Sequence, residues 1–176
     1  MAYIISQVFV IISYALLALT YLAKDRKKIL TMSFLAVLAN AIAFILLGAW
    51  SGFVMSLVAM GRNIVFLIRG NDKKINYVDY IILGILYLII AVSSYFTYVG
   101  LFSLFSVFGT MIYTYSAWQK NPKVYKLLGI PSSLCWIIYN IYVSSVFGAI
   151  LESILLIFEV VGTIKALKEK PKLQEK

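Results

Sequence analysis

The chain has 176 residues, of which 62% are hydrophobic and only 13% are charged, with a mean hydropathy of +0.94 and a formal net charge of +9. So little polar surface would not cover the apolar remainder in water, so the composition excludes a soluble protein and predicts one whose solvent is lipid. The basic residues flank the apolar segments, which indicates membrane topology and contact with anionic lipid headgroups, and we expect no nucleic-acid partner.

Seven apolar segments follow one another along the chain. Each has 17–21 residues, enough to cross a hydrocarbon core about 30 Å thick at a rise of about 1.5 Å per residue. The connections alternate between basic loops and short uncharged turns. The sequence therefore predicts an all-α membrane protein with seven transmembrane helices at residues 3–23, 29–47, 52–68, 77–96, 99–118, 124–142 and 147–167.

The positive charges fall on one side of this arrangement. Fifteen of the sixteen Lys and Arg residues lie in or beside alternate loops or near and after the end of the last segment, and Arg62 is the exception. The positive-inside rule then predicts that the N-terminus lies outside and the C-terminus in the cytoplasm. The charged residues 169–176 are expected to form a disordered basic tail.

The order of loops and turns suggests an internal repeat. The first three helices and the last three share one pattern, and an offset of 96 residues aligns Ile42 with Ile138 and Gly52 with Gly148. A single extra helix between two three-helix units gives both units the same orientation, which is a parallel repeat about an axis along the membrane normal. We therefore expect a 3+1+3 layout: residues 1–75 form the first unit, 76–98 the linker helix and 99–168 the second unit.

Three charged side chains, Arg62, Glu152 and Glu159, fall at membrane depth, away from the ends of the apolar segments, where a charge is costly and by default marks a site. An Arg62–Glu159 ion pair would make both tolerable and would lock the two units together, although Arg62 also has the length to snorkel towards an interface. Glu152 lies in the outer half, where the sequence offers no basic partner. It is expected to be protonated, exposed to water, or part of a substrate or proton site.

Polar and aromatic residues in the sixth segment suggest a binding site for a solute. Trp136 and Asn140 are four residues apart and share a helix face, which suits apolar stacking on a flat polar solute together with a few directed hydrogen bonds. Asn40 and Asn63 lie in the other unit. The alternative for each asparagine is an interhelical hydrogen bond that joins two helices.

Catalytic chemistry is not expected. The chain has no histidine and a single cysteine, Cys135, so the commonest general base and the commonest metal ligand are missing. It contains no phosphate-binding loop and no nucleophile motif. We therefore expect no enzyme activity, no cofactor and no metal, and the sequence leaves the oligomeric state open.

The whole chain resembles the YgjV-like bacterial inner membrane proteins over about residues 4–168. The residues that carry the resemblance are Ile5–Ser6–Gln7, the stretch 43–49, Ile130–Pro131–Ser132–Ser133, and the stretch 136–140. The resemblance implies a multi-pass protein of the bacterial inner membrane and names no substrate.

The 3+1+3 layout also resembles the architecture of the SWEET and PQ-loop transporters and of the nicotinamide riboside transporters. SWEET-like transporters place tryptophan and asparagine residues around a central site, which by resemblance implies Trp136, Asn140, Asn40 and Asn63 here. One departure is that the segments 3–23 and 99–118 contain no proline, whereas PQ-loop families carry a proline–glutamine pair there. A rocking motion in this chain would need another hinge.

Two functions follow as hypotheses. The first is transport of a small polar solute by rocking of the two units around a central pocket, with Glu152 coupling transport to protons. The second is a membrane scaffold that binds a partner or lipid through its helix faces. Convergence of Asn40, Asn63, Trp136, Asn140 and Glu152 on one cavity would favour transport, and their dispersal to separate helix contacts would favour the scaffold.

Overall fold

The fold is a bundle of long α-helices in which successive helices run antiparallel, seen in a computed structural model that describes residues 1–22, 26–69, 75–119 and 122–168. These residues form seven α-helices and one short 3₁₀ helix, η1. The elements are α1 (Ala2–Leu22), α2 (Arg26–Leu46), α3 (Trp50–Arg69), α4 (Tyr77–Phe96), η1 (Leu101–Ser103), α5 (Leu104–Trp118), α6 (Pro122–Tyr142) and α7 (Val146–Lys168).

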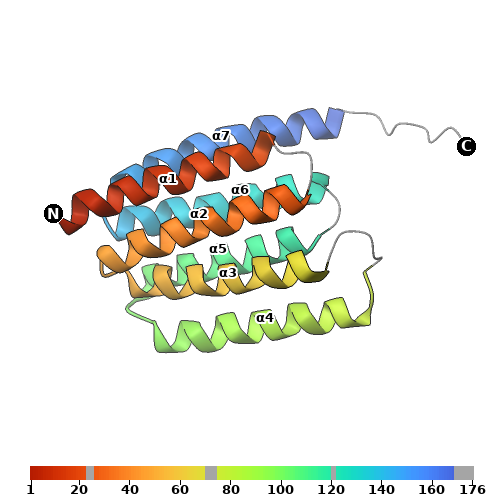
Figure 1. The fold of residues 1–176 in the computed structure, drawn as a ribbon, viewed down its shortest axis with the longest axis horizontal. Coiled ribbons are helices and arrows are strands. Elements are labelled where there is room, and N and C mark those ends of the chain that lie inside the picture. Colours follow the sequence, from red (N-terminus) through yellow and green to blue (C-terminus); the bar gives the residue numbers. More distant parts are fainter. Residues whose placement is uncertain (23–25, 70–74, 120–121, 169–176) are drawn as a thin grey trace, which may run out of the picture.

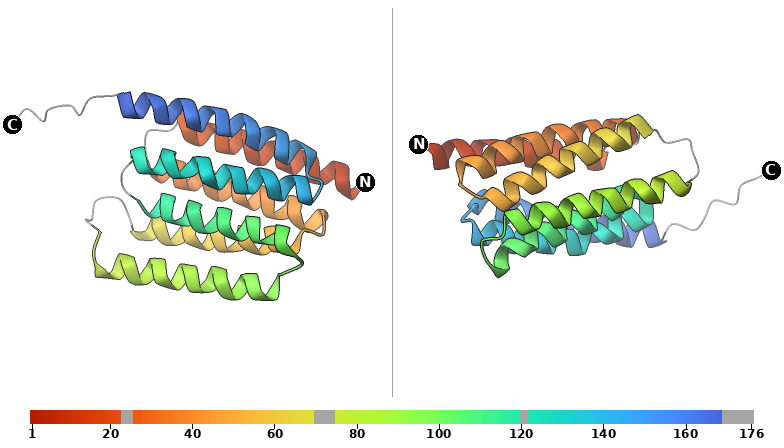
Figure 2. Two further views of the ribbon diagram at one scale, coloured as in Figure 1. Left: turned by 180° about the vertical axis from the view of Figure 1, so that it is seen from behind. Right: turned by 90° about the horizontal axis from the view of Figure 1, so that it is seen from below.

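The helices form two layers of three, with α4 along one edge. In one layer α2 packs between α1 and α3, and in the other α6 packs between α5 and α7. The layers meet where α1 contacts α7 and where α3 contacts α5, and α4 contacts both α3 and α5 (Figures 1 and 2). We call the end that carries the α2–α3 and α6–α7 connections the turn end, and the opposite end the loop end.

Four helices have the length and apolar composition of membrane spans. Within the described residues these are Ala2–Thr20, Lys27–Leu46, Trp50–Arg69 and Tyr77–Phe96, and α6 contributes a shorter apolar stretch. The expectation of helices that can span a membrane is thus confirmed for α1 to α4 by length and composition, and spanning by α5, α6 and α7 stays a prediction. Helices suit this solvent because they satisfy the backbone hydrogen bonds within each segment.

The start of the fifth helix differs from the prediction. A single helix was expected over residues 99–118, but the α-helix begins at Leu104 and is preceded by η1. Gly100 has φ of +146°, which lies outside the helical region and which residues with a side chain rarely adopt. The apolar composition of this stretch continues through the break, so hydropathy alone places the helix start too early.

The α2–α3 and α6–α7 turns have the same backbone geometry. Gly48 and Ser144, which are 96 residues apart, both lie in the left-handed region with φ of +69° and +57°. Five backbone hydrogen bonds recur at the same offset of 96 residues. In the first turn they run from N–H to C=O as 47 to 43, 48 to 45, 49 to 44, 50 to 48 and 53 to 49, and in the second as 143 to 139, 144 to 141, 145 to 140, 146 to 144 and 149 to 145.

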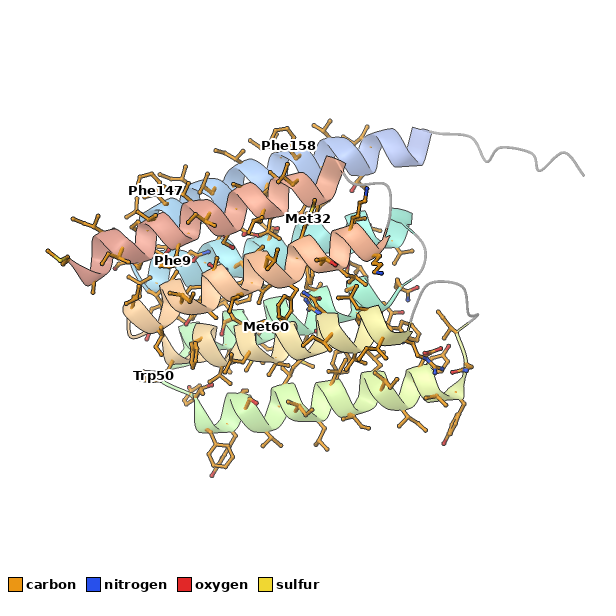
Figure 3. All side chains as sticks on the ribbon, viewed as in Figure 1. Phe9, Met32, Trp50, Met60, Phe147 and Phe158 are labelled. Carbon is orange, nitrogen blue, oxygen red and sulfur yellow. The ribbon has the colours of Figure 1, made fainter. Side chains whose placement is uncertain are left out.

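The polarity of the bundle is inverted relative to a soluble protein. On α5 the buried side chains include Ser106, Thr110 and Thr114, whose hydroxyls donate to backbone carbonyls of the preceding turn. Large apolar side chains face outward instead: Phe147 and Phe158 project from the outer side of α7 (Figure 3) and are 44% and 60% exposed. This distribution is the one expected where lipid covers the outside and polar groups meet inside.

The start of α4 is fixed to its neighbours at the loop end. Asn76 and Asp79 form a capping box, in which each side chain accepts a hydrogen bond from the backbone N–H of the other residue. Arg69 of α3 donates to the Asp79 carboxylate at 2.6 Å and to the Asn76 side chain at 2.7 Å. The Trp118 indole of α5 donates to the Asp79 carbonyl at 3.2 Å. One end of α4 therefore holds both α3 and α5.

Candidate functional site

A cavity of about 90 Å³ lies between the two layers. Side chains from α1, α2, α3, α5, α6 and α7 line it, and α4 contributes none among the described lining residues. From Trp136 and Glu152 it extends towards the loop end, where Thr20, Ser33 and Glu159 also line it. The cavity is therefore shared by both three-helix layers.

Glu152 of α7 stands at the centre of a polar group that joins α1, α6 and α7. The Tyr14 hydroxyl donates to Glu152 Oε2 at 2.5 Å, and Asn140 Nδ2 donates to the same hydroxyl at 3.4 Å. Ser133 of α6 lines the cavity together with Tyr14 and Glu152. Glu152 and Tyr14 both line the cavity and are only 8% and 4% exposed, so a buried carboxylate sits in a cage of hydroxyl and amide groups.

Arg62 of α3 is 1% exposed and contacts side chains of its own helix and of α5. Its Nη1 donates to Thr114 of α5 at 3.2 Å, and its Nε and Nη2 donate to Asn63 Oδ1 at 3.3 and 3.2 Å. Asn63 Nδ2 in turn donates to the Ser33 hydroxyl of α2 at 3.1 Å. The guanidinium carbon also lies 4.8 Å from the ring centre of Tyr113, a distance typical of a cation–π contact.

Glu159 reaches the cavity across the backbone of α6. A Cβ atom added to Gly129 would lie 2.8 Å from Glu159 Oε1, so the carboxylate rests where any larger residue would collide with it. Glu159 is 5% exposed and lines the cavity together with Arg62. The glycine at position 129 therefore makes room for an acidic group at the loop-end half of the cavity.

The Trp136 indole forms one wall of the cavity. It lies against the backbone of α5, because a Cβ on Gly109 would be 2.8 Å from its Nε1. On its other side it stacks on Phe44 of α2, with ring centres 5.9 Å apart and planes inclined by 17°. Trp136 is thus positioned by a glycine on one layer and by an aromatic ring on the other.

An aromatic cluster fills the space between the cavity and the turn end. Phe44 and Tyr139 are fully buried, and their rings meet edge to face at 5.6 Å. The Tyr139 hydroxyl accepts the Gly52 N–H at 2.7 Å and hydrogen-bonds the Ser51 hydroxyl at 2.8 Å. Tyr139 of α6 therefore caps the start of α3 in the opposite layer. The cluster comprises Phe44, Ala49 and Tyr139, with Leu47, Phe53, Phe105, Trp136 and Val143 packed against it.

The structure brings most of the expected site residues together. Asn40, Trp136, Arg62, Glu152 and Glu159 line the cavity.

Two expected residues lie beside the cavity rather than on its wall. Asn63 donates to Ser33 of α2, and Asn140 of α6 donates to Tyr14 of α1, which is the interhelical role that the sequence offered as the alternative. The Arg62–Glu159 ion pair stays a prediction, although both side chains border the same space.

Several residues of the site were not expected from the sequence. Tyr14 and Tyr113 line the cavity, and Tyr139 closes its turn-end side. Tyrosine in a membrane protein is usually read as an interfacial residue. The available signal was depth, because Tyr14 falls near the middle of its apolar segment rather than at an end.

A match to a protein-family model adds to this geometry. The family, Imp-YgjV, is described as a bacterial inner membrane protein, and its model matches residues 4–170. No curated protein and no solved structure matches the chain. The matched residues take in nearly all of α1 to α7, which confirms the expected family, whereas the likeness to SWEET and PQ-loop transporters stays an architectural expectation. The chain belongs to the YgjV-like family of bacterial inner membrane proteins.

Proposed function

We propose that this protein carries a small polar solute across the membrane through the cavity between its two helix layers. The observation that supports the proposal is the cavity itself. Its wall combines Arg62, Glu152, Glu159, Asn40 and Trp136 at a depth where lipid surrounds the bundle. Charged groups are costly there and mark pathways for solutes or protons in membrane proteins.

The layered arrangement supports a rocking mechanism. The α2–α3 and α6–α7 turns repeat the same hydrogen bonds at an offset of 96 residues, as expected of two units in parallel orientation. Phe44, Trp136 and Tyr139 fill the turn-end side. In this proposal the aromatic cluster is the gate on that side, and rocking of the layers exposes the cavity alternately to each side of the membrane.

The proposal is tested by ligand-induced stabilisation of the purified protein. Sugars, nucleosides, vitamins and amino acids are screened for a rise in melting temperature, in parallel with Trp136→Ala and Trp50→Ala. Trp50 is 57% exposed at the turn end and is the matched control for losing an indole. A solute that stabilises the wild type and Trp50→Ala, but not Trp136→Ala, supports a binding site in the cavity.

A scaffold that transports nothing is the second candidate. It is favoured by the mutual bonding of the buried polar groups, such as Tyr14 with Glu152 and Asn63 with Ser33. Such bonds also serve to join helices. If no solute stabilises the protein and Trp136→Ala and Trp50→Ala lower stability equally, the cavity has no special role and the scaffold becomes the better description.

A further inference from the structure

A second hollow, on the outside of the bundle, is lined by α4, α5 and α6. We call it the lateral groove, and its volume is about 350 Å³. Its floor is one face of α5, because the four residues that α5 contributes are spaced three and four positions apart. Tyr87 of α4 and Leu128 of α6 form the two walls. The α5 residues are Phe108, Met111, Ile112 and Tyr115.

The lateral groove lies at the depth of the hydrocarbon core. Tyr87 is near the middle of α4 (Tyr77–Phe96), a helix with the length and composition of a membrane span. The Tyr87 hydroxyl donates to the Met111 carbonyl at 3.3 Å, which holds α4 and α5 at the same level. From Phe108 to Tyr115 the floor is about 10 Å long, at a rise of about 1.5 Å per residue. The groove therefore takes its occupant from the membrane rather than from water.

The size and chemistry of the groove select a hydrocarbon chain. The lining side chains are apolar or aromatic, and the Tyr87 hydroxyl already donates to Met111. A methylene group is similar in size to a water molecule, which occupies about 30 Å³ in the liquid, so 350 Å³ holds roughly ten methylene groups. A helix about 10 Å wide would need about 800 Å³ over the same length. One acyl chain therefore fits the groove better than a helix of a partner protein or of a second copy.

Aromatic side chains mark the headgroup level at the loop end of the groove. Tyr115 stacks on Trp118, with ring centres 5.7 Å apart, and Tyr80 of α4 meets Trp118 edge to face at 5.2 Å. The Trp118 indole is fixed in turn by its hydrogen bond to the Asp79 carbonyl. Tyrosine and tryptophan concentrate at the boundary between hydrocarbon and headgroups. An acyl chain in the groove therefore has its glycerol end beside these rings.

Positive charge adjoins the same end of the groove. Lys123 and Lys126 belong to the first two turns of α6, about 8 and 3 Å along the helix axis from Leu128 towards the loop end. The acidic residue at the start of α4, Asp79, forms an ion pair with Arg69. Lysines beside the membrane surface attract anionic lipid headgroups, and basic sites between transmembrane helices on the cytoplasmic side bind them. The predicted topology places the loop end on that side.

We infer that the lateral groove binds one acyl chain of an anionic phospholipid, whose headgroup lies beside the lysines at the start of α6. The site is distinct from the cavity between the layers, because the two share no described lining residue. It also gives α4 a role, since α4 contributes no described residue to that cavity but forms one wall of the groove. The inference does not depend on the transport proposal.

The test is native mass spectrometry of the purified full-length protein released from detergent micelles. The micelles contain equal amounts of dioleoyl phosphatidylglycerol and dioleoyl phosphatidylcholine, which have the same acyl chains and differ in headgroup charge. We expect one phosphatidylglycerol per protein, preferred at least about fivefold over phosphatidylcholine. Glycerol 3-phosphate, which has a phosphate and no acyl chain, should not displace the lipid. Displacement by it would identify a phosphate site and overturn the assignment of the groove.

The groove is blocked from its floor by Ile112→Trp, which places an indole where the acyl chain would lie. This variant should bind phosphatidylglycerol at least about tenfold more weakly. Ile154→Trp is the matched control, because Ile154 lies on α7, is 43% exposed and is not part of the groove, and it should bind as the wild type does. Should Ile112→Trp not fold, as judged by helical circular dichroism, Leu128→Trp blocks the groove from the α6 wall with the same expected loss.

The headgroup is tested separately from the chain. The double variant Lys123→Gln/Lys126→Gln should lower the affinity for phosphatidylglycerol by at least about tenfold and leave that for phosphatidylcholine unchanged, because it removes charge and leaves the groove intact. Lys170→Gln/Lys172→Gln removes the same number of charges from the C-terminal end of the sequence and should keep the preference.

Two results would overturn the inference. One is equal binding of the two lipids by the wild type, and the other is an equal loss of phosphatidylglycerol in Ile112→Trp and Ile154→Trp. A dimer that forms in the wild type and is lost only in Ile112→Trp would show instead that a second copy occupies the groove. None of these results bears on transport, which is tested by solutes that stabilise the wild type but not Trp136→Ala.

Discussion

Tyr139→Phe should destabilise the protein because it removes a cap that one layer supplies to the other. The Tyr139 hydroxyl is buried and accepts the Gly52 N–H at 2.7 Å, within the first turn of α3, where an N–H has no acceptor inside its own helix. Leaving such a buried donor unsatisfied costs about 1–3 kcal/mol. The Ser51 hydroxyl also loses its partner at 2.8 Å but is free to rotate. We expect a loss of about 2 kcal/mol, or roughly thirtyfold in the unfolding equilibrium.

The loss is measured by reversible unfolding in mixed micelles, followed by helical circular dichroism. Tyr142→Phe is the matched control, because Tyr142 lies on the same helix and is 43% exposed. It should change the free energy of unfolding by less than about 0.5 kcal/mol. The reasoning is refuted if Tyr139→Phe is as stable as the wild type, or if both variants lose the same amount.

Three further predictions concern packing, the α4 cap and topology. Gly52→Ala should lower the free energy of unfolding by about 1–3 kcal/mol, because its Cβ would lie 2.7 Å from Tyr139 Cε1. The control Gly84→Ala places a Cβ with nothing within 4 Å and should not destabilise the protein in the same unfolding assay. Asn76→Ala should cost about 1 kcal/mol and speed hydrogen exchange in the first turn of α4, and unchanged exchange there would contradict the capping role. Topology is tested with single-cysteine variants of a cysteine-free background in intact cells. A membrane-impermeant maleimide should label Tyr98→Cys at the turn end, because the Tyr98 side chain is 56% exposed, and should label Tyr77→Cys at the loop end only after lysis. The reverse pattern would invert the predicted topology.

The helices could be read from the sequence because apolar length and charge both mark their ends. The fourth helix was placed at its observed bounds of Tyr77–Phe96, between a basic loop and an uncharged turn. The start of the fifth helix was missed because the break at Gly100 depends on backbone conformation, and the residues around it are as apolar as those of a helix. Hydropathy indicates whether a segment is surrounded by lipid or by water, but it does not indicate the backbone dihedral angles of that segment.

The ionisable residues of the site were identified for a similar reason. The cost of charge in lipid singled out Arg62, Glu152 and Glu159 without any knowledge of packing. Their partners were not predictable in this way. Tyr14 and Glu152 are 138 positions apart in the chain, and their contact exists only because α1 packs beside α7. Pairings of this kind require the helix arrangement, which a single sequence does not supply.

The attachment of α4 has a mechanical consequence. The Asp79 carboxylate binds Arg69 of α3, and the Asp79 carbonyl accepts the indole of α5, so one residue pins both layers at the loop end. Two rigid layers that are joined at one end move least relative to each other at that end and most at the opposite end. Any relative motion of the layers is therefore largest at the turn end, where the short stretch 97–100 connects α4 to η1.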